Sequence, residues 1–446
     1  MRRLSVIISV VLFGSHCYSQ EFRFPAFDRL WLSGQINLVT QFHPSFPALY
    51  SGPASLHQYS EAATTWVGTI YTGYAVSKNT EVFCDFESAR GAGVSGALGL
   101  GGLGDLDAVT DHSASAAPYI ARAQLRQIIP LGGDMNETTS SPLGLATVLP
   151  TKRIEVRVGK MSLTDFFDLN SVGSDSHLQF LNYAIDNNAA YDIAADSRGY
   201  AYGALIELYQ PKWAVRFATV LEPKDTSGQR TDWNLSRSRS ENVEVEIHPE
   251  LIPKRAGVFR ALAFVNHSSM GNYREAVEAY LSGRDPRPDL SAHIQPHQKS
   301  YGFGLNGEQE INSYLRVFGR FGWNQGSREA FQFAEADHTI ALGADFDGRK
   351  WRRSGHRLGL AMAVNGLAAI HRQYLELGGM SYLLGDNGLE YGREHIVEAY
   401  YNLRLAHGVY AAFDIQRVWN PGYNHNRGPV LIFGIRLHLE GDLHFN

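Results

Sequence analysis

The sequence predicts an all-β fold, a transmembrane antiparallel β-barrel of about sixteen strands. Three observations predict it. Apolar and polar residues alternate in segments of strand length, no apolar run beyond the N-terminal segment is long enough for a membrane helix, and short connections alternate with long ones. Successive side chains of a strand point to opposite faces, so each segment would have an apolar face for lipid and a polar face for a water-filled lumen.

The alternation is clearest between Glu394 and Glu440, where Val397, Ala399 and Tyr401 are separated by more polar residues. Each run has about the 9–11 residues that a tilted strand needs to cross a bilayer. Applied to the whole chain, the pattern predicts an even number of strands, which places both chain ends on the periplasmic side. The candidate strands are residues 32–38, 64–76, 80–90, 118–131, 153–162, 200–211, 213–223, 242–250, 257–267, 299–311, 313–324, 338–347, 357–366, 393–406, 409–421 and 428–440.

The connections between these strands alternate in length. Short links follow the second, sixth, tenth and fourteenth strands, and long links follow most odd-numbered strands, as in barrels with short periplasmic turns and long external loops. The longest link, Ser162–Gly199, is predicted to fold into the pore, because loops of more than about 12–15 residues are often functional. The link Gly132–Lys152 should be short and is not. Either it is an elaborated periplasmic turn or the strand count is wrong there.

The composition is compatible with a barrel. The 446 residues include 44 glycines and 12% aromatic residues, which suit strands, interfacial girdles and tight turns. A mean hydropathy of -0.22 follows if half of the strand residues face a polar lumen. The net charge of -5 gives no reason to expect nucleic acid as a partner.

The N-terminus has the three-part pattern of a secretory signal peptide. Arg2 and Arg3 precede the apolar run Leu4–Phe13, and small or polar residues follow around Cys17. We expect residues 1–19 to be the signal peptide and residues 20–446 to be a single outer-membrane barrel domain. The run is too short for a membrane anchor, and the residues before Cys17 match a lipoprotein acylation site poorly. Cleavage would leave Cys84 as the one cysteine, which excludes an internal disulfide and a cysteine-based metal site.

Several segments carry a family resemblance. Val158–Asn170 reads VGKMSLTDFFDLN and resembles the signature GK-x-S-x-x-D-F-F-D-x-N of the carbohydrate-selective porins (OprB type) of bacterial outer membranes. Phe180–Asn182 and Ala195–Tyr200 resemble the segment that follows it, and Trp419–Asn424 with Arg427–Val430 resembles the last external loop and final strand of that family. The resemblance extends over most of the chain from about residue 30. It implies a sixteen-stranded barrel whose activity is the passive diffusion of sugars.

The alternation also predicts which side chains face the lumen. An Arg on the lipid face near the bilayer midplane costs roughly 2–4 kcal/mol, so the register is strongly enforced. Arg donates hydrogen bonds to sugar hydroxyls and carboxylates accept them, and the contacts must stay weak for a solute to leave. Alternatively, these charges only solvate the wall and pair with each other. The predicted pore-lining and solute-contacting residues are Arg122, Arg126, Arg157, Arg198, Arg216, Arg316, Arg320, Asp345, Glu398 and Arg404.

Charged residues of the loop Ser162–Gly199 are predicted to lie at a constriction. The alternative is that they cap and order the loop itself. Aromatic rings on which a sugar can slide are predicted among inward-facing strand residues. The predicted constriction residues are Asp165, Asp168 and Asp196, and the aromatic candidates are Tyr314, Phe318 and Tyr400.

Other functions have less support in the sequence. Gly99–Gly104 has the glycine spacing of a dinucleotide fingerprint but lies in a loop without the βαβ context, and no G-x-S-x-G elbow is present. We therefore expect no enzyme, no cofactor and no metal. A barrel hydrolase would need a nucleophile and a base at the rim, and a polysaccharide-export or general-diffusion barrel remains an alternative. The expected partners are permeating sugars and outer-membrane lipid, with the oligomeric state left open between trimer and monomer.

Overall fold

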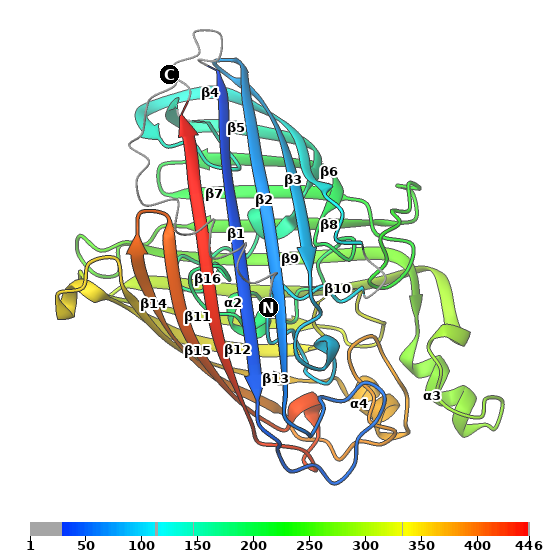
Figure 1. Cartoon of the computed structure of the whole chain (residues 1–446). Helices are drawn as coiled ribbons and strands as arrows, with labels where there is room; N and C mark the ends of the chain where they lie inside the picture. The colour runs from blue at the N-terminus through cyan, green and yellow to red at the C-terminus, as the bar shows by residue number, and fades with distance from the viewer. Residues whose placement is uncertain (1–28, 112–114, 146, 332, 445–446) are drawn as a thin grey trace.

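The computed structural model describes residues 29–111, 115–145, 147–331 and 333–444. These residues form sixteen antiparallel strands that close into a barrel, with β1 paired to both β2 and β16, which confirms the predicted fold (Figure 1). The predicted signal peptide lies outside the described residues. The strands are β1 (Leu30–His43), β2 (Glu61–Ser77), β3 (Thr80–Arg90), β4 (Tyr119–Thr138), β5 (Thr147–Met161), β6 (Ala201–Gln210), β7 (Trp213–Val220), β8 (Arg239–Ile247), β9 (Gly257–Gly271), β10 (Ile294–Glu310), β11 (Leu315–Asn324), β12 (His338–Asp347), β13 (Arg357–Gly366), β14 (Glu394–Ala406), β15 (Val409–Trp419) and β16 (Val430–His444).

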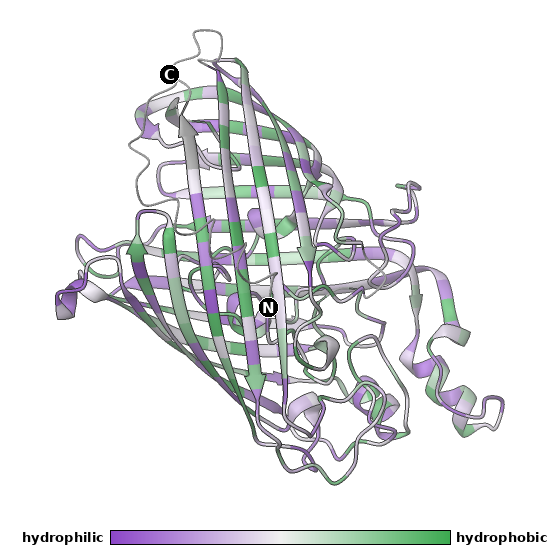
Figure 2. Ribbon diagram, in the orientation of Figure 1, coloured by the Kyte–Doolittle hydropathy of each residue, from purple (hydrophilic) through white to green (hydrophobic). Residues whose placement is uncertain are grey.

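The period-two pattern separates an apolar outer face from a polar lumen. Phe413 and Ile435 are exposed on the outside, whereas Asp414 and Arg436, which follow them directly in the sequence, are buried inside. Figure 2 shows hydrophobic and hydrophilic residues alternating along the strands. No helix among the described residues is long and apolar enough to cross a membrane.

Short turns and long loops lie at opposite ends of the barrel. The turn between β14 and β15 consists of His407 and Gly408, and Gly408 has a φ of 65°, a conformation that glycine adopts readily. The external loops carry short helices, of which α3 and α4 lie at the end opposite the β4–β5 turn (Figure 1). The helices of the described residues are η2 (Val94–Ala97), η3 (Leu163–Asp165), α2 (Tyr183–Asp186), α3 (Tyr273–Leu281), η4 (Ser291–His293), η5 (Gly348–Trp351), α4 (Ala369–Glu376) and η6 (Pro421–Tyr423), of which η5 lies in the periplasmic turn between β12 and β13.

The link Gly132–Lys152, which is long where a short link was predicted, is an elaborated periplasmic turn. β4 and β5 continue past the barrel wall as one long hairpin and still pair at Thr138 and Thr147. The predicted strand count is therefore right.

The predicted external loop folds into the barrel, and so does a segment of another external loop that the sequence did not predict to enter it. The predicted loop, Ser162–Gly199, fills much of the interior with buried residues such as Phe167 and Phe180. The second insertion is Gly99–Leu106, between β3 and β4, whose Leu106 N–H donates to the carbonyl of Leu181 over 3.1 Å. Its glycines allow close passage, because a Cβ at Gly101 would collide with the Tyr423 hydroxyl.

Candidate functional site

Two cavities lie inside the barrel along one part of its wall. The external cavity, about 370 Å³, lies between the two inserted loops and strands β1–β4. The periplasmic cavity, about 290 Å³, lies between the loop Ser162–Gly199, strands β4–β7 and the β4–β5 hairpin. Asp165 lines both. We call the wall formed by β1–β7 the open side, and the wall formed by β8–β16 the docked side.

Asp165, which lines both cavities, forms an ion pair with Arg122. Arg122 of β4 donates from Nε to Oδ2 of Asp165 over 2.7 Å and from Nη2 to Oδ1 over 2.6 Å. Asp165 ends the helix η3, which begins two residues after β5, so the loop delivers the carboxylate straight to the wall. A second carboxylate, Asp85, lies 3.5 Å from Nη1 of Arg122. The pair is mostly buried, with side-chain exposures of 13% for Arg122 and 14% for Asp165.

Tyrosine rings and polar groups surround this pair on the external side. The Tyr200 hydroxyl donates to Oε2 of Glu87 over 3.0 Å, and the Arg198 guanidinium lies 3.6 Å from the centre of the Tyr119 ring. Tyr119 and Tyr200 are pore residues that the alternation pattern did not predict. In β4 a β-bulge places Asp85 opposite two residues, so Tyr119 and Arg122 both face inward although strict alternation puts them on opposite faces.

The periplasmic cavity is lined by charges of both signs on neighbouring strands. Arg126 of β4 donates from Nε to Glu155 of β5 over 2.8 Å, and Arg216 of β7 donates from Nε to Glu207 of β6 over 3.3 Å. Arg126 also lies directly opposite Arg157 in the ladder, a repulsion that is offset because both guanidinium groups pair with Glu155. The charges therefore form a mixed band across the open side.

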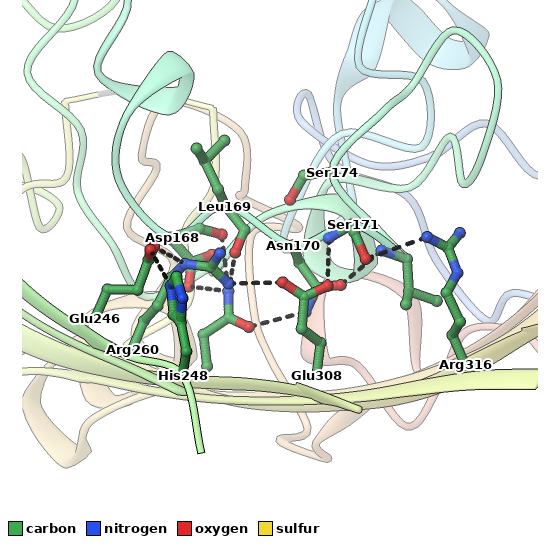
Figure 3. A network of polar contacts seen from close by, with 12 residues as sticks. Asp168, Leu169, Asn170, Ser171, Ser174, Glu246, His248, Arg260, Glu308 and Arg316 are labelled. Atoms are coloured by element: carbon green, nitrogen blue, oxygen red, sulfur yellow. Dashed lines mark hydrogen bonds and ion pairs between the residues drawn. The ribbon is translucent and has the colours of Figure 1, made fainter. Parts of the chain in front are cut away.

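The docked side uses the same residue types to hold the loop. Arg320 forms an ion pair with Asp168 over 2.9 Å and donates from Nη1 to the carbonyl of Ile185 over 2.6 Å. Glu398 accepts from the backbone N–H of Leu181 over 2.6 Å. Figure 3 shows the loop segment from Asp168 to Ser174 lying over β8–β11, with Glu246, Arg260, Glu308 and Arg316 of those strands pointing toward it or toward one another.

The packing of the loop shifts the pKa values of two of its titratable groups, Asp186 and His177. Burial raises the pKa of Asp186 to about 8, although Arg320 opposes the shift. Burial lowers the pKa of His177, but the Asp107 carboxylate 3.3 Å away outweighs it, and the net pKa is raised. Both groups line the external cavity.

Comparisons with known proteins agree with this architecture. Among solved structures, the chain is similar to Pseudomonas putida OprB at high pH, with a TM-score of 0.69, 12% identity, and coverage of 93% of this chain and 94% of that chain. It is also similar to the outer membrane channel DcaP of Acinetobacter baumannii, with a TM-score of 0.47, 8% identity, and coverage of 92% and 97%. A search of curated proteins finds no match. A model described as carbohydrate-selective porin, OprB family, matches residues 61–440.

The chain belongs to the OprB family of carbohydrate-selective porins. The predicted resemblance is thereby confirmed, and the chain is a sugar-passing porin of the bacterial outer membrane. The family is a class of channels and not a class of enzymes.

The predicted pore residues of this porin fall into two groups. Most of those on the open side line a cavity, whereas those on the docked side contact the loop or each other, as Arg316 and Asp345 do. Arg404 is exposed beside His407 at a periplasmic turn. The cavity-lining members of the prediction are Arg122, Arg126, Arg157, Arg198, Arg216 and Asp165.

The remaining predicted residues of this porin lie away from the two cavities. Asp168 is buried against Arg320, and Asp196 caps a turn by accepting from the N–H of Arg198 over 3.0 Å. Phe318 and Tyr400, predicted as a track for sugars, are buried against Phe180 of the loop because the loop occupies the lumen in front of them. The third aromatic candidate, Tyr314, is exposed beside a periplasmic turn.

The described part of the chain contains no candidate metal site. No group of three or more His, Cys, Asp or Glu residues there is arranged to hold a metal ion. Cys84 is a free thiol.

Proposed function

We propose that mono- and small oligosaccharides cross this porin by passive diffusion along its open side. The path runs through the external cavity, past the pair Arg122–Asp165 and through the periplasmic cavity. One observation carries this proposal, namely that Asp165 lines both cavities and therefore stands on the path between them. The bilayer offers a sugar no hydrogen bonds, whereas these cavities offer donors and acceptors throughout.

The chemistry of the path suits a neutral polyol. Arg122 and Arg198 supply forked donors, Glu87 and Asp165 supply acceptors, and the Tyr119 ring supplies a flat apolar surface. Each charged group already has a partner on the wall or loop, so a sugar hydroxyl competes with an existing contact and is held weakly. Weak binding is required, because a solute that is held tightly does not leave a channel.

The residues of the docked side act on the path indirectly. Arg320 through Asp168, and Glu398 through the N–H of Leu181, fix the loop Ser162–Gly199, and the fixed loop places Asp165 against Arg122. We therefore assign solute contact to the cavity-lining residues and a positioning role to those on the docked side. Arg404 and Asp196 have neither role in this proposal.

Liposome swelling tests the proposal. Vesicles that contain the purified protein should swell with mono- and disaccharides, and the variant Arg122→Ala should change the relative rates of small and larger sugars because it alters the narrow point. Swelling no greater than that of protein-free vesicles overturns the proposal. Arg404→Ala is the matched control, since its guanidinium is exposed at a turn and should leave all rates unchanged.

The alternative functions have less support from the geometry. A polysaccharide-export barrel would carry a continuous track of one charge sign, whereas both cavities here carry Arg and carboxylate side chains together. A general-diffusion barrel would show no preference among sugars of similar size, so sugar panels in the same swelling assay separate it from a sugar-selective one. Competition between sugars for the path is the expected result.

We also propose that residues 1–19 are removed on export and that residues 20–446 form the mature barrel domain. N-terminal sequencing of protein from outer membranes should then begin at Gln20. The choice between trimer and monomer stays a prediction that chemical cross-linking in membranes would test.

A further inference from the structure

The β4–β5 hairpin bends back over the periplasmic end of the barrel. The bend lies at Gly132 and Gly133, which have φ values of 104° and 89°, and the ladder between the two strands shifts register at the same place. Ser141 and Gly144 close the tip as a tight turn through backbone hydrogen bonds of 2.7 and 3.2 Å. Pro142 between them suits the second position of such a turn.

The tip is anchored inside the lumen. Leu145 is buried against Trp31 and Phe83, which are inward-facing residues near the periplasmic ends of β1 and β3. A Cβ at Gly73 of β2 would lie 2.6 Å from Cδ2 of Leu145, so the wall accommodates Leu145 because this position has no side chain. The Leu145 N–H also donates to Oε2 of Glu81 over 3.4 Å. Apolar packing of Leu145, the space that Gly73 leaves in the wall and the hydrogen bond to Glu81 together hold the tip in place.

The same tip forms one wall of the periplasmic cavity. Ser141 and Gly144 line the cavity, and the carbonyl of Leu143 accepts from Nη2 of Arg157 over 2.7 Å. Gly144 lies against the Arg126 guanidinium, since a Cβ there would be 2.7 Å from Nη1. Arg157 is 4% exposed, and its Nε and Nη1 make no hydrogen bond, although Nε lies 3.7 Å from Glu207. A solute that has passed Arg122–Asp165 therefore meets buried donors and the hairpin tip before it leaves.

We propose that the hairpin tip, Ser141–Leu145, is a second constriction that sets the largest sugar this porin releases to the periplasm. It acts in series with the pair Arg122–Asp165, one at each end of the periplasmic cavity. The claim on sugar size rests on the proposed function, whereas the claim on pore width is testable with ions alone. A short turn between β4 and β5 would need neither the bend at Gly132–Gly133 nor the space that Gly73 leaves for Leu145.

Trimming the hairpin tests the proposal. Removal of residues 134–150 joins Gly133 to Thr151 as a two-residue loop next to the ladder pair Gly132 and Lys152. Single-channel conductance in KCl should rise by up to about twofold, because two narrow points in series share the resistance of the pore. Swelling with tri- and tetrasaccharides should rise relative to swelling with glucose. Removal of residues 250–254 from the β8–β9 turn, where Leu251 is 74% exposed, is the matched control and should change neither quantity.

A second variant, which should narrow the pore instead of widening it, keeps the proposal testable if the trimmed protein fails to insert. Ser141→Trp adds bulk at a position that lines the cavity, so it should lower conductance and the swelling rate of trisaccharides. The proposal is overturned if trimmed or Ser141→Trp channels conduct and sieve sugars as the unmodified protein does. Failure of the proposed function looks different, because the unmodified protein would then pass ions but no sugar.

Discussion

The open side and the docked side of the barrel carry the same kinds of inward-facing residues and use them differently. On the docked side, Arg320 is fully buried and binds the loop carbonyl of Ile185. On the open side, Arg122 keeps 13% of its side chain exposed and faces a cavity. The difference lies in what each guanidinium has in front of it, which is irregular backbone in one case and solvent-sized space in the other. An inward charge in a barrel is thus a solute contact only where no loop lies over it.

The loop lies on the docked side because its backbone polar groups find partners there. Buried N–H and C=O groups outside regular secondary structure need partners, and an unpaired one costs about 1–3 kcal/mol. Asn402 donates to the carbonyl of Leu178 over 2.8 Å, and Arg436 donates to the carbonyl of Gln179 over 2.9 Å. On the open side, wall residues such as Arg126 and Glu155 instead satisfy each other, which leaves room for water and solute.

The largest expected effect comes from removing the central cation of the docked side. Arg320→Ala should lower the free energy of unfolding by about 3–5 kcal/mol, because it leaves the buried carboxylate of Asp168 without its ion-pair partner. The freed loop should also make single-channel currents noisy. Heat-modifiable gel migration and planar-bilayer recordings measure the two effects. Arg404→Ala should stay within about 0.5 kcal/mol of the unmodified protein, since Arg404 is exposed.

On the open side, Arg122→Ala should affect stability less, and transport more, than Arg320→Ala does. Arg122→Ala should weaken block of the ion current by sugars about tenfold, since a hydrogen bond to a charged group contributes about 1.5 kcal/mol. It should also shift the pore toward cations, because the Asp165 carboxylate remains without its cationic partner. The reversal potential in a salt gradient measures this shift. The distinction between the two sides fails if Arg316→Ala, on the docked side, weakens sugar block as strongly.

The smallest effect concerns the external end of the docked side and depends on pH. His371 of α4 stacks on Tyr273 of α3 with ring centres 4.2 Å apart, and its Nδ1 lies 3.0 Å from Asp337. Burial lowers the pKa of His371, but Asp337 and Glu335 outweigh it and raise the pKa to about 9 from 6.5. A raised pKa means that the imidazolium stabilises the fold fully below pH 6.5, and that this contribution is lost as the pH rises through about 9.

Hydrogen exchange at the amides of α4 measures this effect. Exchange should accelerate between pH 7 and 10 beyond the intrinsic chemical rate, because the imidazolium that ties α4 to Asp337 loses its charge in this range. His371→Gln should remove the excess pH dependence. If the substituted protein keeps the same pH profile as the unmodified one, the imidazolium does not hold α3 and α4 together.

The strands, the two faces of the barrel and the family could be predicted from the sequence, but the difference between the open side and the docked side could not. Arg122 and Arg320 both satisfy the alternation rule, which reports only that a side chain faces inward. The loop that covers Arg320 lies more than 100 positions earlier in the sequence. No local sequence pattern can therefore predict the contact. Tyr119 was missed for a local reason, since the bulge in β4 interrupts the alternation that the prediction assumed.

By itself, the sequence determined the barrel, the lipid and lumen faces and the unusual length of the β4–β5 link. These features depend on the two-residue period of a strand and on the cost of a charge in lipid, both of which act residue by residue. Tertiary structure alone decided where the inserted loops lie, which inward charges they cover and that the hairpin tip enters the pore. Those outcomes depend on pairing between distant backbone groups and wall side chains, and such pairing exists only once the barrel has closed.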